Sequence, residues 1–409
     1  MFRGERLAAR IASLGRIGAR PGGGVCRLAL SDSEKQGRDW LVAEMEALGL
    51  RIAVDPIGNI FGTRAPRPGT DAQAPHVMIG SHIDTVATGG LYDGALGVVA
   101  GLEVIAALND GGTETDLPVT LAAFSNEEGA RFAPDMLGSL VYAGGLPLAE
   151  ALDIVSIDGA RFGDELARIG YAGHGRGPAR VAAYLELHVE QGPILEDEGV
   201  QIGVVEGVQG ISWTEVVLKG QSSHAGTTPL RLRADAGFGA GIIAAGLRDL
   251  IGAVGPSQLG TVGAITLSPN LVNVVAEEAR LTVDLRNPDN TGLKAAEAGL
   301  ADLVARAAAR ANVRATTRSL ARFEPVDFAP DLVAMVEEQA AGMGFSHRRM
   351  FSGAGHDAQM IARIAPAAMV FVPSKGGISH NVREFTTAED CQRGGALLHA
   401  LVRRLSLRN

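Results

Sequence analysis

The 409-residue sequence has little cysteine, few aromatic residues and no excess of positive charge. Its two cysteines, Cys26 and Cys391, are too few for a disulfide framework or a thiolate zinc site, so we expect a reducing compartment, with the cytoplasm as the default. The 37 basic and 46 acidic residues give a net charge of −9, which argues against a surface for nucleic acid or anionic lipid. We also expect no membrane segment, because no stretch approaches the roughly 20 apolar residues of a transmembrane helix.

The sequence does have the length and the 46% hydrophobic content of a globular protein with two or three domains. Short apolar runs at 76–80, 118–124, 181–187 and 367–372 predict buried strands. Helical periodicity predicts helices at 33–48, 97–108 and 388–405. Buried strands that alternate with helices indicate an α/β fold with a mostly parallel central sheet covered on both faces.

The pattern changes between about residues 210 and 323. Strands are predicted at 213–219, 261–267, 279–286 and 313–322, and helices at 231–250 and 292–311. This β-α-β-β-α-β order is that of a ferredoxin-like unit. The sequence therefore predicts a discontinuous domain of residues 1–209 and 324–409, interrupted by an inserted domain of residues 210–323.

Histidine and acidic residues gather where four of the predicted strands end. The four clusters lie at residues 80–94, 126–129, 186–193 and 353–381. Because ligands bind beyond the carboxyl ends of strands in an open parallel sheet, we expect these clusters to converge. Their donors are imidazoles and carboxylates without thiols, a set that suits zinc, manganese, cobalt or nickel.

Spacing within the clusters indicates the role of individual side chains. His82 and Asp84 are two residues apart and share a face of extended backbone, which suits an imidazole ligand held by a carboxylate behind it. Asp93 follows a glycine-rich turn, where a carboxylate can approach closely enough to bridge two cations. The adjacent Glu127 and Glu128 point in opposite directions, so that one can bind a metal while the other acts as a base.

Each cluster by itself also has an ordinary interpretation. A histidine after a strand is often a helix cap, and two adjacent glutamates usually form a solvated turn. His76, His347 and His399 have no such neighbours, and we expect them to be structural or surface residues. The coincidence of four clusters favours a metal-dependent hydrolase.

Several motifs resemble a known family. Residues 80–86 (GSHIDTV) and 92–98 (YDGALGV) resemble the di-metal M20 peptidase and amidohydrolase superfamily. Residues 186–193 (ELHVEQGP) are similar to its hydantoinase/carbamoylase amidase branch, because most M20 peptidases have an acidic residue where His188 stands. Residues 223–229 (SHAGTTP) and 352–358 (SGAGHDA) match the same branch. The resemblance covers nearly the whole chain and implies that residues 210–323 form a lid and dimerisation domain.

The resemblance implies two divalent metal ions per subunit, zinc or alternatively manganese, cobalt or nickel. One ion would be held by His82, Asp93 and His188. The other would be held by Asp93, Glu128 and His380, with Asp93 bridging the two. Glu127 would be the general base, and Asp84 would orient His82.

The resemblance also implies which residues contact the substrate. On the lid, His224 would stabilise the oxyanion or position the amide, while Asn273 and Arg286 would bind the substrate, Arg286 by clamping a carboxylate. The pocket would be completed by Gln191, Gly353, Ala354 and Gly355. The family commonly has Pro-Gly after residues 273–275, whereas this chain has Ala276 and Glu277, a departure that affects the loop of Asn273.

The function implied by the resemblance is hydrolysis of the ureido group of N-carbamoyl-L-amino acids to amino acid, ammonia and carbon dioxide. The first alternative is an allantoate amidohydrolase, followed by a β-ureidopropionase, and His188 disfavours an aminoacylase or dipeptidase. A non-catalytic binding protein on the same fold is a remote alternative, because it would be expected to lack Glu127 or a ligand. We expect a small ureido acid as partner, and a homodimer formed through the lid.

Overall fold

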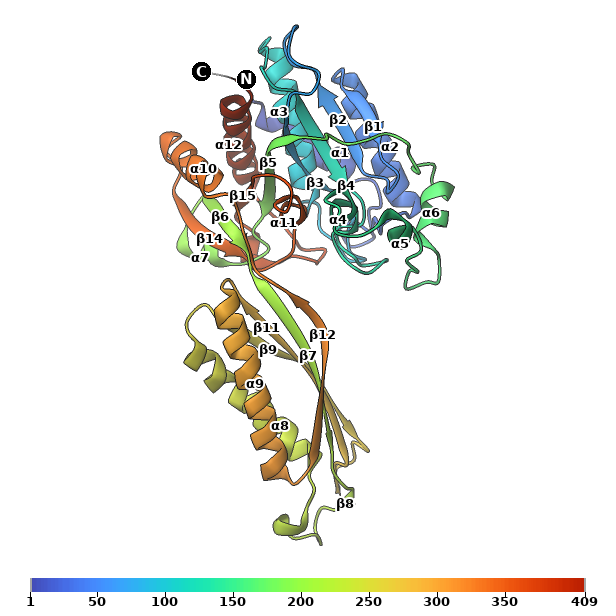
Figure 1. Ribbon diagram of the computed structural model, residues 1–409, viewed down its shortest axis with the longest axis vertical. Coiled ribbons are helices and arrows are strands. Elements are labelled where there is room, and N and C mark those ends of the chain that lie inside the picture. Colours follow the sequence, from blue (N-terminus) through green and yellow to red (C-terminus); the bar gives the residue numbers. More distant parts are fainter. Residues whose placement is uncertain (1, 408–409) are drawn as a thin grey trace. The chain divides into compact units, whose positions relative to one another are not determined.

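The computed structural model describes residues 2–407, which divide into two compact units. Unit 1 comprises the residues up to Glu206 and from Asp327 onward, and unit 2 is Gly207–Val326 (Figure 1). The predicted insertion at 210–323 lies within unit 2. Its role as a lid and dimerisation domain stays a prediction.

Unit 1 is built around one nine-stranded sheet with the order β1-β2-β4-β3-β5-β15-β6-β13, in which β14 also pairs with β6. Its strands are β1 (Arg51–Val54), β2 (Ile60–Arg64), β3 (His76–His82), β4 (Val119–Phe124), β5 (Val181–Val189), β6 (Ile202–Val208), β13 (Val326–Asp327), β14 (His347–Ser352) and β15 (Ala367–Val372). The four central strands β4, β3, β5 and β15 run parallel, whereas β1, β2 and β6 pair antiparallel. The predicted parallel centre is confirmed, and the antiparallel strands flank it.

Unit 1 also contains helices, several of which pack against this sheet. They are α1 (Gly4–Leu14), α2 (Asp32–Ala47), α3 (Ala95–Asp110), α4 (Leu137–Tyr142), α5 (Leu148–Leu152), α6 (Phe162–Arg168), α7 (Ile194–Glu198), α10 (Pro330–Gly342), α11 (Asp357–Ile361) and α12 (Ala388–Ser406), with a short 3-10 turn η2 (Lys375–Gly377). Every residue of α3 from Ala95 to Leu108 is buried, as expected of a helix that is apolar all round. It packs against β3, β5 and α12.

The parallel strands bring the predicted clusters to one edge of the sheet. β3 ends at His82, and β4 ends three residues before Glu127. His188 is the residue before the last in β5. His82 pairs in register with Phe124, and His188 with Phe371 of β15, so the four strand ends are level. Because these strands are neighbours in the sheet, their carboxyl ends deliver polar residues to one place.

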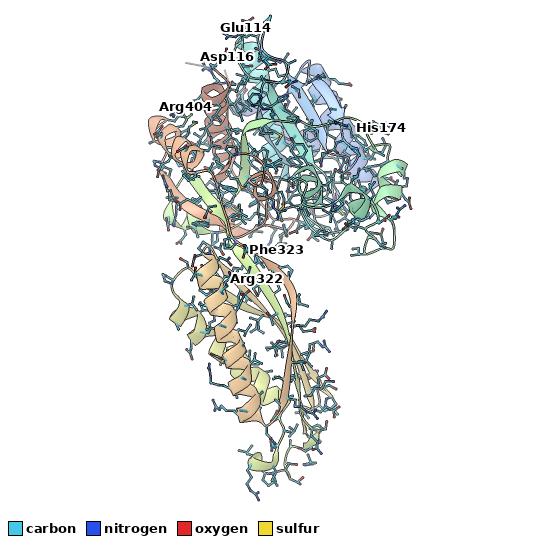
Figure 2. The ribbon with its side chains drawn as sticks, viewed as in Figure 1. Glu114, Asp116, His174, Arg322, Phe323 and Arg404 are labelled. Atoms are coloured by element: carbon cyan, nitrogen blue, oxygen red, sulfur yellow. The ribbon has the colours of Figure 1, made fainter. Side chains whose placement is uncertain are left out.

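Unit 2 is a four-stranded antiparallel sheet with two long helices. Its elements are β7 (Gly210–Lys219), β8 (Ser223–His224), η1 (Leu230–Leu232), α8 (Ala236–Val254), β9 (Leu259–Ser268), β10 (Val274–Val275), β11 (Glu278–Asn287), α9 (Asn290–Ala311) and β12 (Arg314–Phe323). The sheet order is β12-β7-β11-β9, and β8 pairs separately with β10. Arg322 and Phe323 lie in β12 (Figure 2). Arg322 contacts Glu297 of α9 at 3.0 Å. The main elements follow the predicted β-α-β-β-α-β order.

Helix α8 differs from the sequence prediction in two ways. It begins at Ala236 instead of residue 231, because the Asp235 side chain accepts a hydrogen bond from the amide of Phe238 and caps the helix there. It is also long and apolar enough to cross a membrane by length and composition, so the expectation that no stretch approaches this length is wrong for α8. Ala240, Ile243 and Leu247 of this helix are buried in the core of unit 2.

Candidate metal centre

Two histidines and one aspartate form the first candidate metal group. Nε2 of His82 lies 3.6 Å from Oδ1 of Asp93, and Nε2 of His188 lies 3.3 Å from the same oxygen. Nδ1 of His82 lies 3.0 Å from the Asp84 carbonyl, and Nδ1 of His188 lies 2.9 Å from the Val189 carbonyl. Donation by each Nδ1–H leaves the Nε2 lone pairs directed toward Asp93. Nε2 of His82 is buried and has no hydrogen-bond partner among the described residues, as expected of a metal ligand.

The second group uses the other oxygen of the same aspartate. Nε2 of His380 lies 3.3 Å from Oδ2 of Asp93 and 3.2 Å from Oε2 of Glu128. The ligand atoms of each group all lie within 4.8 Å of one another. Asp93 is nearly buried, whereas 52% of the His380 side chain is exposed. Both groups therefore contain Asp93, the residue predicted to bridge the two metal ions.

The backbone at Gly94 keeps space free beside these ligands. Gly94 has a φ of +60°, and a Cβ at this position would lie 2.3 Å from Nε2 of His82. Any larger residue would fill the space between His82 and Asp93. The Gly94 amide also donates to Nε2 of His188 at 3.0 Å. The residues therefore fit a cation at this position by donor type and by available space.

Asp84 holds the turn that carries the two adjacent glutamates. Its carboxylate accepts hydrogen bonds from the amides of Glu127 at 3.2 Å and Glu128 at 3.3 Å. Asn126, which precedes them, adopts a φ of +55°. The Asp84 carboxylate is 3.8 Å from Nδ1 of His82, so the contact with His82 is made by the Asp84 backbone carbonyl instead.

The charges at this edge of the sheet are not balanced without cations. Burial raises the pKa of Glu127 well above its ordinary value, and the nearby Asp357 and Glu128 carboxylates add to the increase. Hydrogen bonds that the protonated His380 ring donates to the Asp93 and Glu128 carboxylates raise the pKa of His380 to about 10. Protonated imidazoles thus offset crowded carboxylates, a role that divalent cations would take over on binding.

A third group of potential ligands, Glu186, His188 and His356, is committed to other partners. The carboxylate of Glu186 accepts hydrogen bonds from Ser81 at 2.6 Å and from the amide of Ala358 at 2.9 Å. Nε2 of His356 lies 2.8 Å from the hydroxyl of Ser352. These contacts make the third group a structural support behind His188.

Of the predicted pocket residues of unit 1, Gln191 contacts a candidate metal ligand. Gln191, with a φ of +57°, donates from Nε2 to Oδ2 of Asp93 at 2.8 Å. In the predicted turn of Gly353, Ala354 and Gly355, the Ala354 amide donates to the Ser352 hydroxyl at 3.1 Å. This turn directly precedes His356 and α11.

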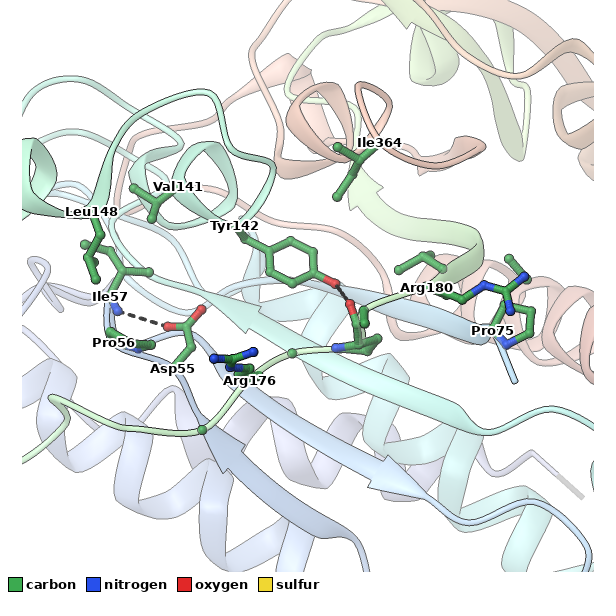
Figure 3. A pocket seen from close by; sticks show the side chains of 16 residues that line it. Asp55, Pro56, Ile57, Pro75, Val141, Tyr142, Leu148, Arg176, Arg180 and Ile364 are labelled. Atoms are coloured by element: carbon green, nitrogen blue, oxygen red, sulfur yellow. Dashed lines mark hydrogen bonds between the residues drawn. The ribbon is translucent and has the colours of Figure 1, made fainter. Parts of the chain in front are cut away.

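A cavity of about 810 Å³ elsewhere in unit 1 contains neither metal group. Its lining includes Ile57, Tyr142, Arg176 and Ile364 (Figure 3). The Tyr142 hydroxyl donates to the carbonyl of Pro178 at 2.5 Å across it. No predicted catalytic residue lines this cavity.

The predicted substrate residues of unit 2 lie at two different places. His224 in β8 pairs with Val274 in β10, and the amide of Ala225 donates to the carbonyl of Asn273, so His224 and Asn273 are neighbours. Nδ1 of His224 accepts hydrogen bonds from the amides of Gly226 and Thr227, at 3.0 and 3.2 Å. The proton of the neutral ring therefore sits on Nε2, which is left as a donor.

Arg286 lies in the four-stranded sheet of unit 2, toward the end that is remote from β8. It pairs in register with Ile211, whereas Lys219 near β8 pairs with Glu278, eight residues earlier in β11. At about 3.3 Å per residue, eight residues span roughly 26 Å. The Arg286 guanidinium contacts the Asp284 carboxylate at 2.9 Å. One chain therefore does not bring His224 and Arg286 to the same small substrate.

Sequence reasoning missed Glu384, which is nearly buried beside Asp93. Its Oε1 accepts hydrogen bonds from the amides of Tyr92 at 2.9 Å and Asp93 at 3.0 Å. The available signal was an acidic residue four positions after His380. That spacing alone does not distinguish Glu384 from an ordinary turn residue.

The chain is similar to proteins of known family and structure. Residues 78–404 match the model of peptidase family M20/M25/M40. An N-carbamoyl-L-amino-acid amidohydrolase from Rhizobium meliloti is 40% identical over 400 residues, which cover 97% of this chain and 95% of the relative. An allantoate amidohydrolase from Bacillus subtilis is 33% identical over 402 residues, covering 96% of this chain and 95% of the relative. The crystal structure of a hydantoinase/carbamoylase family amidase from Burkholderia multivorans has a TM-score of 0.96 and 43% identity, and covers 100% of this chain and 98% of that one.

Proposed function

The chain belongs to peptidase family M20/M25/M40, and on this basis we propose that it hydrolyses the carbamoyl C–N bond of N-carbamoyl-L-amino acids. The products would be an amino acid, ammonia and carbon dioxide. The observation that carries the proposal is that two groups of potential metal ligands share Asp93 and lie next to Glu127. The names of the relatives from Rhizobium meliloti and Geobacillus stearothermophilus support this substrate class.

We propose that two divalent metal ions, zinc or alternatively manganese, cobalt or nickel, occupy the two groups. His82, Asp93 and His188 would hold one ion, and Asp93, Glu128 and His380 the other. Bound there, the ions would supply an activated water and polarise the carbonyl oxygen of the ureido group. The unpartnered Nε2 of His82 and the space kept by Gly94 support this occupancy.

Glu127 would move the proton during hydrolysis. Its Oε2 lies 3.3 Å from Nε2 of His82, at the margin of the first group, and the residue is 7% exposed. From this position the carboxylate would accept a proton from the attacking water and deliver it to the leaving nitrogen. The hydrogen bonds that the amides of Glu127 and Glu128 donate to the Asp84 carboxylate hold the turn from which this side chain extends.

Residues of unit 2 would bind the substrate. The Nε2–H of His224 is oriented as a donor and would stabilise negative charge on the carbonyl oxygen. Arg286 would bind the substrate carboxylate through its planar guanidinium. Asn273 lies beside His224 and would contact the same end of the substrate.

We propose that the protein is a homodimer formed through unit 2. Strand β9 is an edge of the unit 2 sheet, and Leu259, Ile265 and Leu267 on it are exposed. An exposed apolar edge strand favours association with a second copy. The separation of His224 from Arg286 supports the same conclusion, because a second subunit could supply His224. We place the enzyme in the cytoplasm, where its two free cysteines would stay reduced.

A substrate panel tests the proposed activity. Metal-free protein would be reconstituted separately with Zn²⁺, Mn²⁺, Co²⁺ or Ni²⁺ and assayed for ammonia release from N-carbamoyl-L-amino acids, allantoate and β-ureidopropionate. We expect the highest kcat/KM with an N-carbamoyl-L-amino acid. Preference for allantoate would support the second candidate, which the Bacillus subtilis relative favours. Failure to hydrolyse any ureido substrate with any of these metals would contradict the proposal.

A further inference from the structure

A carboxylate outside both metal groups holds the backbone that carries Asp93. Glu384 is 5% exposed, and its Oε1 accepts hydrogen bonds from the amides of Tyr92 and Asp93, at 2.9 and 3.0 Å. The fit is close, because a Cβ at Gly90 would lie within 2.4 Å of the Glu384 side chain. Glu384 therefore fixes the position of the Asp93 backbone at two adjacent points.

The same carboxylate connects this backbone to the segment of His380. The hydroxyl of Ser379 lies 3.1 Å from Oε2 of Glu384 and 3.1 Å from Oδ2 of Asp93. The amide of Glu384 also donates to the carbonyl of Asn381 at 2.9 Å, which closes the turn after His380. Glu384 thus joins the segment of His380 to Asp93, which is 291 residues away from Glu384 in sequence.

This network controls the direction of the Asp93 carboxylate. To serve both groups, Oδ1 must face His82 and His188 while Oδ2 faces His380. Rotation about the Cβ–Cγ bond or a shift of the backbone would lose one of the two contacts. The hydrogen bonds from the Tyr92 and Asp93 amides to Glu384 prevent the shift of the backbone. The hydrogen bonds that Ser379 and Gln191 donate to Oδ2 oppose rotation of the Asp93 carboxylate.

We propose that Glu384 is a positioning residue that holds Asp93 as the bridge between two metal ions. The inference rests on the proposed two-metal function and adds a residue that contacts neither ion group directly. Outer partners of metal ligands typically contribute about 10- to 100-fold to metal affinity. Loss of Glu384 is therefore expected to weaken uptake of the metal pair and not merely to slow turnover.

The test measures binding of Mn²⁺ to metal-free protein, by competition with a chromophoric chelator and by electron paramagnetic resonance. A bridged pair of Mn²⁺ ions gives a spin-coupled signal that isolated ions do not. Glu384→Ala removes the hydrogen bonds to both amides and is expected to weaken pair binding about 10- to 100-fold and to reduce the coupled signal. Glu384→Gln keeps an oxygen for both amides and is expected to stay within about threefold of the original protein.

Glu103→Ala is the matched control. Glu103 is also fully buried, but its carboxylate is bound by Arg6 and Arg10, away from both metal groups. Its loss should lower stability without changing the coupled signal. If Glu384→Ala does not fold, Ser379→Ala provides the same test, with a smaller expected loss of pair binding.

The outcomes separate this inference from the proposed function. If the unmodified protein binds no coupled pair, the two-metal proposal fails and the inference fails with it. If the unmodified protein binds the pair and Glu384→Ala binds it equally well, only the inference is overturned. An equal loss in Glu103→Ala would also overturn it, because the effect would then come from stability alone.

Discussion

Glu127 is the residue on which the proposed chemistry depends most directly. It belongs to neither ligand group, yet its Oε2 lies 3.3 Å from Nε2 of His82. Glu127→Gln preserves shape and removes the proton acceptor, so kcat should fall by about 10²- to 10⁴-fold. Metal content, measured by atomic absorption, should remain unchanged.

Glu114→Gln, at an exposed position of unit 1, controls for the amide substitution and should retain full activity. Near-normal turnover of Glu127→Gln would remove the assignment of the general base. Loss of metal together with activity would instead make Glu127 a ligand.

Arg286 tests recognition of the substrate carboxylate. Arg286→Ala should raise KM for N-carbamoyl amino acids by about 10- to 100-fold, because charge-assisted hydrogen bonds contribute about 1.5–3 kcal/mol. The effect on kcat should be much smaller. Steady-state kinetics would measure both constants. Arg280→Ala is a control on the same strand, since Arg280 contacts Glu215 on the neighbouring strand β7. An unchanged KM for Arg286→Ala would contradict the role in substrate binding.

The elements that were predicted best are those whose environment leaves a simple pattern. Strand β15 was predicted at its observed bounds, because continuous apolar residues mark a strand buried on both faces. Strands β6, β13 and β14 were not predicted, since they are shorter or less uniformly apolar. The beginning of α8 was misplaced because the Asp235 cap outweighed the apolar pattern of residues 230–232.

The candidate site could be predicted as clusters but not as contacts. Strand topology explains why His82, Glu127, His188 and His380 converge, because ends of neighbouring parallel strands meet at one edge. Glu384 accepts hydrogen bonds from backbone amides of a segment distant in sequence. Such hydrogen bonds produce no periodic pattern in the sequence from which they could be predicted. Asp84 illustrates the same limit, because its carboxylate reaches the amide of Glu127 and not the ring of His82.

Strand β3 offers a test at the scale of one element. A Cβ at Gly80 would lie 2.1 Å from the carbonyl oxygen of Ala122 on β4. Gly80→Ala must therefore separate the two strands that carry His82 and Glu127, at a cost of about 1–3 kcal/mol in unfolding free energy. Urea denaturation measures this change.

Gly342→Ala is the matched control for Gly80→Ala. It lies at the end of α10, where a Cβ would meet nothing within 4 Å, and should leave stability unchanged or increase it by up to about 1 kcal/mol. Equal stability of the two variants would show that β3 and β4 tolerate a wider spacing.

Helix α12 carries a half-buried histidine, His399, that should make stability depend on pH. Burial, and then the charge of Arg403, lowers the pKa of His399 to about 4 from its ordinary value of 6.5. Between these values the unfolded chain binds more protons, so the unfolding free energy should fall as pH decreases from 6.5 to 4. His399→Gln should reduce this slope, whereas the exposed His174→Gln should not. Urea denaturation at pH 4.5 and 6.5 would measure the difference, and identical slopes would contradict it.

At the scale of the whole molecule, the position of His224 decides how many chains form one active site. Arg286 lies at the end of the four-stranded sheet of unit 2 that is remote from β8 and His224, eight residues of β11 away from the end that leads to β8. A substrate of a few ångströms cannot contact both in one chain. If both residues bind the substrate, a second chain must contribute one of them.

Mixed dimers test this arrangement. Glu127→Gln and His224→Ala chains would be purified as inactive proteins, unfolded together and refolded, and then assayed for ammonia release. If His224 acts in the partner's site, each mixed dimer gains one site with an intact Glu127 and an intact His224. Half of the dimers are mixed and half of their sites are active, so the mixture should recover about a quarter of the original activity. A mixture of Glu127→Gln with His82→Ala should stay inactive, because both changes fall within unit 1 and each disables the site of its own chain. No recovery in the first mixture would place His224 in the site of its own chain, and the sheet of unit 2 would then have to bend or move to bring it there.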